Sequence, residues 1–163
     1  MIAVLAIVFW CIRMVNDFKK KEIRVQEGLS GIEVALTKRY DMLTKMLDTA
    51  KGYMGHESEL FTKVIELRRG MSGAEMNDAQ QLMDALSGRF FAVAENYPVL
   101  RFSEVFAELQ RGIRDAEEHL QAPRRLYNSK VTAYNSVIAM FPAKILAGSH
   151  QPNEFFAADA GKR

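Results

Sequence analysis

The residues best suited to binding or catalysis lie in one stretch near the C-terminal end, where the pair Tyr-Asn occurs twice, seven residues apart. Positions seven apart lie on the same side of a helix, two turns from each other. The asparagine amides and a nearby arginine could therefore line a polar groove for a ligand or a partner peptide. Alternatively, the tyrosines pack in a helix seam while the asparagines bond to a neighbouring helix and fix its register. The candidate residues for either role are Arg124, Arg125, Tyr127, Asn128, Tyr134 and Asn135.

Other groups that could carry chemistry are scattered. His56, His119 and His150 lack the Glu-x-x-His spacing with which helical bundles hold paired metals. The adjacent residues Glu117-Glu118-His119 point in different directions on a helix and make a poor ligand set. The chain has one cysteine, no glycine-rich phosphate loop and no serine elbow. We therefore expect no catalytic residues, no metal and no cofactor, and predict that the protein is not an enzyme.

The helix that carries the Tyr-Asn pairs has an apolar seam. Its members follow steps of four, three, four and three, which is the spacing of a helix packed along another helix. They are Tyr127, Val131, Tyr134, Ile138 and Phe141. This helix is therefore predicted to form one wall of a helical bundle.

Similar stripes predict the other helices. The first is a long helix that contains Gly28 and Gly31 at sites of a bend or a close contact, and its apolar stripe is Leu29, Ile32, Leu36, Tyr40, Leu43, Leu47 and Ala50. A further helix is expected from Leu60 to Met71, before a loop at 70–73. A third runs from about Asn77 to Tyr97, before Pro98, with an inner face of Leu82, Leu86, Phe90, Val93 and Tyr97.

Ser103 is then a predicted N-cap, with Glu104 in the first turn of a helix whose inner face is Val105, Leu109, Ile113 and Leu120. Pro123 should kink or break the chain before Arg124. Beyond Pro142 the helical pattern fades, and Phe155-Phe156 should dock on the bundle. These patterns predict an all-α fold, an antiparallel bundle of about four long helices.

The N-terminal segment is apolar at every residue from Ile2 to Ile12. Eleven helical residues reach about 16 Å, roughly half of a bilayer's hydrocarbon thickness. Extension to Phe18 requires Arg13 to snorkel. We expect residues 1–18 to be an uncleaved anchor, either in a locally thinned bilayer or with a start upstream of Met1. The remaining chain is predicted to form a bundle domain at 19–146 and a partly docked tail at 147–163.

The residues just after this segment indicate orientation. Lys19, Lys20, Lys21 and Arg24, the membrane-proximal basic cluster, follow an apolar run with almost no charge before it. The positive-inside rule then places the C-terminal body in the cytoplasm of a bacterial cell, with a single pass through the inner membrane. The alternative is a domain on the outer side. Lipid is therefore one expected partner, and these lysines favour anionic membrane surfaces.

Composition excludes two broad classes. Hydrophobic residues make up 48% of the 163 positions and charged residues 26%, with a formal net charge of +2. This is neither a disordered chain nor a polybasic nucleic-acid binder, so we expect no nucleic-acid partner. The basic pairs Lys38-Arg39, Arg68-Arg69 and Arg124-Arg125 are expected on solvated helix faces with ion pairs.

Several fragments resemble the LemA family of bacterial membrane-anchored helical proteins. They are Leu36–Leu43, Gly52-Tyr53 with His56-Glu57 and Arg68, Glu95–Leu100, Arg124–Asn128, Tyr134-Asn135 and Phe141-Pro142. They cover nearly the whole chain in the expected order. The chain departs from the family at Thr44, where proline is usual, and at Pro123, where alanine is commoner. The resemblance implies an N-terminal membrane helix followed by a cytoplasmic helical bundle, and it implies no catalytic residues.

Two functions remain open. The first is a non-enzymatic, membrane-anchored scaffold or adaptor that presents its bundle to a protein partner of unknown identity, with self-association into a homo-oligomer also open. The second is a small-ligand-binding or metal-binding bundle at the membrane, with its site among Arg125, Asn128, Asn135 and a glutamate of a facing helix.

Overall fold

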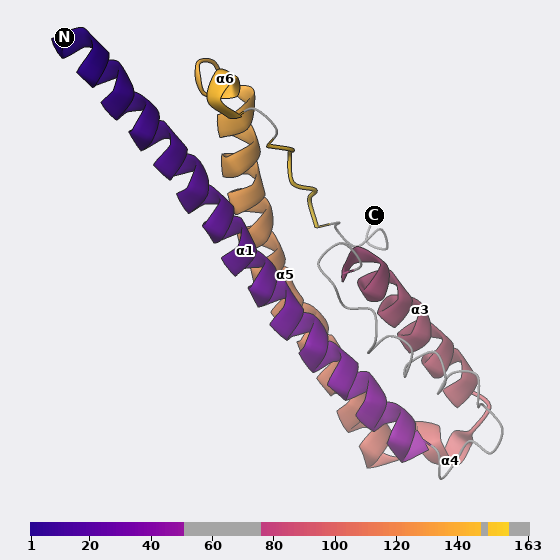
Figure 1. Cartoon of the computed structure of the whole chain (residues 1–163). Coiled ribbons are helices and arrows are strands. Elements are labelled where there is room, and N and C mark those ends of the chain that lie inside the picture. Colours follow the sequence, from indigo (N-terminus) through magenta and orange to yellow (C-terminus); the bar gives the residue numbers. More distant parts are fainter. Residues whose placement is uncertain (51–75, 148–149, 157–163) are drawn as a thin grey trace. The chain divides into compact units, whose positions relative to one another are not determined.

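The computed structural model describes residues 1–50, 76–147 and 150–156 (Figure 1). Its helices are α1 (Ile2–Ala50), α3 (Met76–Ala94), α4 (Pro98–Arg101), α5 (Glu104–Ala139) and α6 (Ala143–Ala147). Over the described residues there is no strand, and the predicted all-α fold is confirmed. The helix expected from Leu60 to Met71, the loop after it, His56 and the pair Arg68-Arg69 lie outside the described residues.

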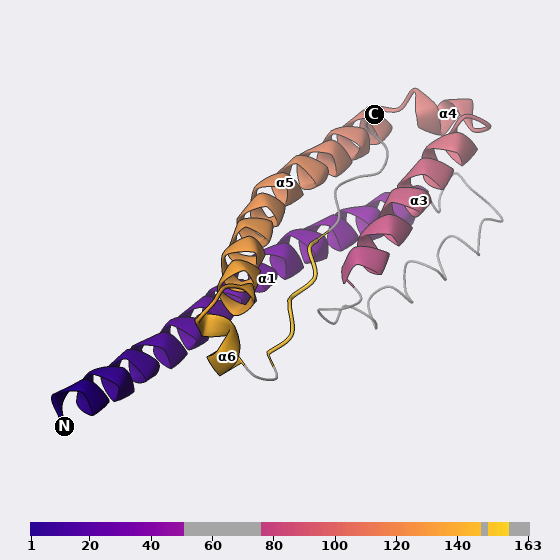
Figure 2. The ribbon, with the colours of Figure 1, turned by 90° about the horizontal axis from the view of Figure 1, so that it is seen from above.

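The chain divides into two compact units. Unit 1 combines Met1–Gly31 with Pro123–Arg163, and unit 2 is Ile32–Ala122. Each unit therefore contains one part of α1 and one part of α5. Figure 2 shows these helices from above together with the segment that follows α6.

In unit 1 the two helices approach closely at a glycine. A Cβ on Gly28 would lie 3.2 Å from the Tyr127 Cα and 3.3 Å from the Lys130 Cδ. A Cβ on Gly31 would lie 3.8 Å from the Pro123 Cβ. Of the two roles predicted for these glycines, the structure shows the close contact. The pairing of 28 with 127 and of 31 with 123 makes the two helices antiparallel within this unit.

The seam predicted on α5 is largely confirmed. Tyr127, Val131, Tyr134 and Ile138 are all buried, as are Phe18 and Val25 of α1 in the same unit. Phe141 is 80% exposed, so the prediction that it extends the seam is wrong. The reason is that α5 ends at Ala139, and beyond that residue the helical periodicity no longer sets the direction of a side chain.

Pro123 lies inside α5 and does not break it. Of the two predicted outcomes, the break is wrong, because α5 continues for many residues on both sides and its other hydrogen bonds outweigh the one that proline removes. The kink stays a prediction. Past Pro142 the short helix α6 adds a turn that the sequence pattern did not predict.

Unit 2 contains the last part of α1, from Ile32, with α3, α4 and the first part of α5, up to Ala122. The stripe of α1 is buried as predicted at Ile32, Leu36, Tyr40, Leu43 and Leu47. In α3 and α5 the predicted faces are buried at Leu86, Phe90, Ile113 and Leu120 and are exposed at one position each. Leu82 and Val105 are exposed, and the neighbouring Met83 and Phe106 are buried instead.

The connection between α3 and α5 shows the expected stop and start signals. α3 ends at Ala94, three residues earlier than predicted, and Pro98 opens α4 at its first position, where its missing N–H costs nothing. The predicted N-cap at Ser103 is confirmed, because its hydroxyl oxygen accepts a hydrogen bond from the Phe106 N–H at 3.1 Å. Phe90, Phe91 and Phe106 then pack with ring centroids 5.8 to 6.0 Å apart.

Two glycines give a matched test of helix packing. No atom lies within 4 Å of a Cβ built on Gly88, so Gly88→Ala should raise the free energy of unfolding by up to about 1 kcal/mol through helix propensity. Gly28→Ala gains the same propensity but pushes against the α5 backbone, a clash that typically costs about 1–3 kcal/mol. Urea denaturation followed by circular dichroism should therefore show Gly28→Ala to be the less stable variant. Equal stability of the two would contradict the close approach at Gly28.

Candidate functional site

The Tyr-Asn pairs of α5 hold an extended segment, residues 150–156, that follows α6 (Figures 1 and 2). The Asn128 side-chain amide donates to the Phe156 carbonyl at 2.9 Å and its oxygen accepts from the Phe156 N–H at 2.9 Å. Asn135 makes the same two bonds, both 2.9 Å, with the main chain of Asn153. We call these four bonds the asparagine ladder and residues 150–156 the C-terminal segment.

The ladder depends on a match between two repeat lengths. Seven residues of α-helix rise about 10.5 Å, which separates Asn128 from Asn135 along α5. Three residues of extended chain, from Asn153 to Phe156, span about 10 Å. Because Asn128 pairs with the later residue and Asn135 with the earlier one, the C-terminal segment runs antiparallel to α5.

The two tyrosines of the pairs add contacts on either side of the ladder. The Tyr127 hydroxyl donates to the Glu154 carbonyl at 3.0 Å, and the Tyr134 hydroxyl lies 3.3 Å from His150 Nδ1. Burial raises the pKa of both tyrosines, with the Glu154 charge adding to the effect at Tyr127 and the Glu22 charge at Tyr134. The His150 ring also lies 6.1 Å from the Phe18 ring of α1, so α1 and α5 both contact this segment.

Comparison with known proteins decides the family. The model of the LemA family matches residues 28–163, most of the chain. The chain belongs to the LemA family. It is also 27% identical over 131 residues to Protein LemA of Metamycoplasma hominis, an alignment that covers 77% of this chain and 60% of that relative. The chain thus spans less than two thirds of that relative's length.

The LemA match includes the whole asparagine ladder on both sides, from Asn128 to Phe156. The sequence identified Tyr127, Asn128, Tyr134 and Asn135 as polar residues of one helix face. In the structure their polar atoms form hydrogen bonds with the C-terminal segment, and not with a neighbouring helix. None of the four ladder bonds involves the flanking arginines, of which Arg125 is exposed and Arg124 is half-buried.

Of the predicted docking pair Phe155-Phe156, only Phe156 is buried. Phe156 is 3% exposed and Phe155 is 52% exposed. Successive side chains of an extended chain point to opposite sides, so a segment held by the Phe156 main chain can bury only one of them.

The membrane-proximal basic cluster is exposed for most of its members, and two of its lysines pair along their own helix. Lys19 Nζ lies 2.8 Å from a Glu22 oxygen, and Lys21 Nζ lies 3.5 Å from an Asp17 oxygen. The hydrogen bond between Lys19 and Glu22 raises the pKa of the lysine and lowers that of the carboxyl. Lys20 and Arg24 are exposed, so most of the charged groups of the cluster are accessible to solvent.

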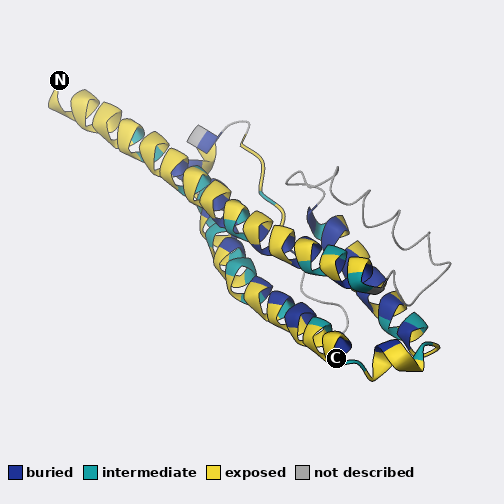
Figure 3. Cartoon of the chain, turned by 90° about the horizontal axis from the view of Figure 1, so that it is seen from below, coloured by how far each residue is buried: buried dark blue, intermediate teal, exposed yellow. Residues whose placement is uncertain are grey.

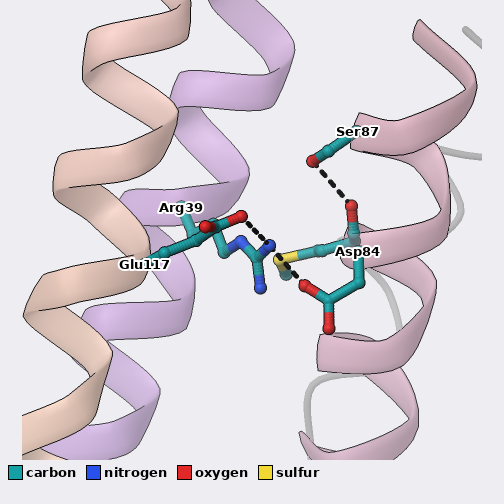
Figure 4. Close-up of polar contacts among 5 residues, drawn as sticks. Arg39, Asp84, Ser87 and Glu117 are labelled. Carbon is teal, nitrogen blue, oxygen red and sulfur yellow. Dashed lines mark hydrogen bonds and ion pairs between the residues drawn. The ribbon is translucent and has the colours of Figure 1, made fainter. Parts of the chain in front are cut away.

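A second polar site, in unit 2, was missed by the sequence analysis. Arg39 is 1% exposed, and its guanidinium contacts the carboxylates of Asp84 on α3 and Glu117 on α5 (Figure 4). The bond to Glu117 is 2.9 Å long. The Arg39 Nε has no hydrogen-bond partner among the described residues. The expectation that Lys38-Arg39 lies on a solvated helix face is therefore wrong for Arg39.

A signal for this burial was present in the sequence. Ile32, Leu36, Arg39, Leu43 and Met46 follow steps of four, three, four and three, and all five are at most 1% exposed. A charged residue at a seam position is costly to bury unless it is paired. Its partners come from other helices, 45 and 78 residues away in sequence, so spacing alone could not identify them.

Other chemistry is sparse in the described residues. They contain no group of three or more His, Cys, Asp or Glu side chains that could hold a metal ion. An open groove of about 800 Å³ lies on unit 2, where its wall mixes basic and acidic side chains, among them Lys45, Asp48, Glu108 and Arg111. The asparagine ladder is therefore the candidate site with the most defined geometry.

Proposed function

We propose that this LemA-family chain is a non-enzymatic, membrane-anchored scaffold or adaptor that presents a helical body to a partner protein. The observation that carries the proposal is the first part of α1. From Met1 to Trp10 every residue is exposed in the described structure, although all of them are apolar (Figure 3). Apolar surface on this scale is unusual on a protein surrounded by water and suits a lipid or protein environment.

The length of this apolar segment determines how it could insert into a membrane. None of the helices over the described residues combines enough length with enough apolar content for a membrane crossing. Ile2–Phe18 spans about 24 Å as a helix, somewhat less than the hydrocarbon core of a bilayer. Arg13 lies over the Phe9 ring, 6.0 Å from its centroid, so its side chain can follow the helix surface. Insertion would then rely on snorkelling and local thinning of the bilayer.

Membrane association in general is a property of the family. The membrane-proximal basic cluster supports an orientation with the body in the cytoplasm and a single pass through the bacterial inner membrane. The scaffold role is supported by the ordered helical units and by the polar contacts of the ladder, which join chain segments.

Removal of residues 1–18 is the direct test of the anchor. In flotation with vesicles of phosphatidylethanolamine and phosphatidylglycerol, the full chain should float with the lipid and the shortened chain should stay in the dense fractions. Far-ultraviolet circular dichroism should show that the body keeps its helices. Flotation of the shortened chain at full yield would refute the anchor.

A matched variant separates anchoring from charge attraction. Replacement of Lys19, Lys20 and Lys21 by glutamine should leave flotation intact while changing the side from which a protease reaches the body in cells. Chemical crosslinking of the full chain in membranes, followed by mass spectrometry, tests the partner. Recovery of crosslinks only within the chain would count against the scaffold role.

A further inference from the structure

We propose that the ladder face of α5 is a peptide-binding site for an extended segment of a partner protein that carries an aromatic residue at the Phe156 position. The chain's own C-terminal segment occupies this site as a competing resident ligand. The inference rests on the proposed scaffold function for the existence of a partner, and it names the chemistry by which that partner would bind.

The ladder recognises the main chain. Each asparagine gives one donor and one acceptor to a single residue of the segment, in the manner of a neighbouring β-strand. The Tyr127 hydroxyl also bonds to a carbonyl. Of these five bonds none involves a side chain of the segment, so any extended segment can form them if neither ladder position is proline.

The spacing of the two asparagines suits an extended peptide in general. Their separation of about 10.5 Å along α5 matches three residues of any extended chain, about 10 Å. A helical peptide would rise only about 4.5 Å over three residues and could not reach both asparagines. The site therefore selects an extended conformation and imposes few requirements on the side chains of its ligand.

Side-chain selection comes mainly from one position. Phe156 is buried, while Gln151, Pro152, Glu154 and Phe155 are exposed. A ligand thus needs an aromatic residue at the second ladder position and has freedom at most others. His150, beside Tyr134 and Phe18, adds one polar contact at the other end.

The chemistry favours another protein over a second copy of this chain. In a second copy the same segment is already held by its own α5, so exchange between copies would gain no contact. A tethered segment also has an effective concentration on the order of millimolar, which an identical segment in solution cannot easily match. A partner segment that makes additional contacts can displace the resident one.

The test uses the full chain in mild detergent and a fluorescent heptapeptide with the sequence of residues 150–156. In the double variant Asn153→Pro/Phe156→Ala, one ladder N–H and the buried ring are lost, so the resident segment should release the site. Fluorescence anisotropy should then show the peptide binding this variant at least tenfold more tightly than the unaltered chain. Adding Asn128→Ala and Asn135→Ala to the variant should abolish binding.

The controls distinguish binding through the asparagine ladder from nonspecific binding of the peptide. Glu154→Pro lies between the two ladder residues and keeps both of their N–H groups. In this single variant the resident segment should stay bound, so the peptide should not bind. A peptide with proline at the Asn153 position should not bind. Equal binding with and without the asparagines, or no binding to the opened variant, would overturn the proposed site.

A second experiment tests whether the ligand comes from a partner protein. Peptide display against the opened variant should enrich sequences with an aromatic residue at one fixed position and no proline at the ladder positions. Enrichment without a shared pattern, or a stable dimer joined by exchanged C-terminal segments, would overturn the partner-protein assignment. Because these measurements need no lipid, their failure is distinguishable from failure of the anchor in flotation.

Discussion

The double variant Asp84→Asn/Glu117→Gln should lose about 3 kcal/mol or more of its free energy of unfolding, the largest effect that we expect from polar substitutions. Both carboxylates contact the guanidinium of Arg39, whose side chain is 2% exposed. Their neutralisation leaves a buried positive charge without a counter-charge, and breaking a buried pair in this way typically costs about 3–5 kcal/mol.

Arg39→Met should cost less, although it removes the same two ion pairs. Methionine fills a similar volume with an apolar, flexible side chain, and the released carboxylates, whose side chains are 42% and 43% exposed, regain water. Replacing a buried ionic group by a packed apolar one is often nearly neutral. The ranking of the two variants is therefore the test, rather than either value alone.

Urea denaturation at neutral pH measures this ranking. The exposed pair of Lys19 and Glu22 provides the control, since Lys19→Gln/Glu22→Gln should leave the unfolding midpoint unchanged. A larger loss for Arg39→Met than for the double carboxylate variant would contradict this ranking and show that an unpaired charge on Arg39 is not the costlier state.

The second large effect concerns the C-terminal segment. Asn128→Ala/Asn135→Ala removes all four bonds of the asparagine ladder, each worth about 1 kcal/mol net. The segment should then detach, and the amides of Asn153 and Phe156 should exchange with deuterium at least about a hundredfold faster. Native-state hydrogen exchange with fragment mass spectrometry reports both amides.

Two single substitutions sharpen this result. Asn128→Asp keeps an acceptor for the Phe156 N–H but sets a negative oxygen against the Phe156 carbonyl, so protection should fall only in part. Thr132→Ala lies on α5 between the asparagines, and its hydroxyl bonds to the carbonyl of Asn128 in its own helix. It should leave exchange at Phe156 unchanged, and rapid exchange in this variant would point to a general loosening of α5.

The sequence predicted those features that depend on local spacing. The all-α fold, the seam from Tyr127 to Ile138 and the cap at Ser103 each follow from residues within a few helical turns. The polar face of α5 was also recognisable, because asparagine twice on one helix face asks for a tertiary partner.

The pairing of the asparagines could not be predicted, because the C-terminal segment has no periodicity and its bonds to α5 join residues 16 or more apart in sequence. The sequence predicted that Phe156 docks on the bundle, but not that its main chain pairs with Asn128. Burial of Arg39 was missed for a related reason, since its carboxylates come from helices far away in sequence.

The antiparallel course of the C-terminal segment has a mechanical consequence. A force applied to the chain beyond Phe156 and directed away from α5 loads the Phe156 pair and its buried ring first, then the Tyr127–Glu154 bond, then the Asn153 pair, then His150. These contacts open in succession, so each step works against only a part of the segment's total stabilisation. A protein that grips the end of this chain could therefore peel the segment from α5 with little force, whereas sliding it lengthwise would require all of the bonds to break together.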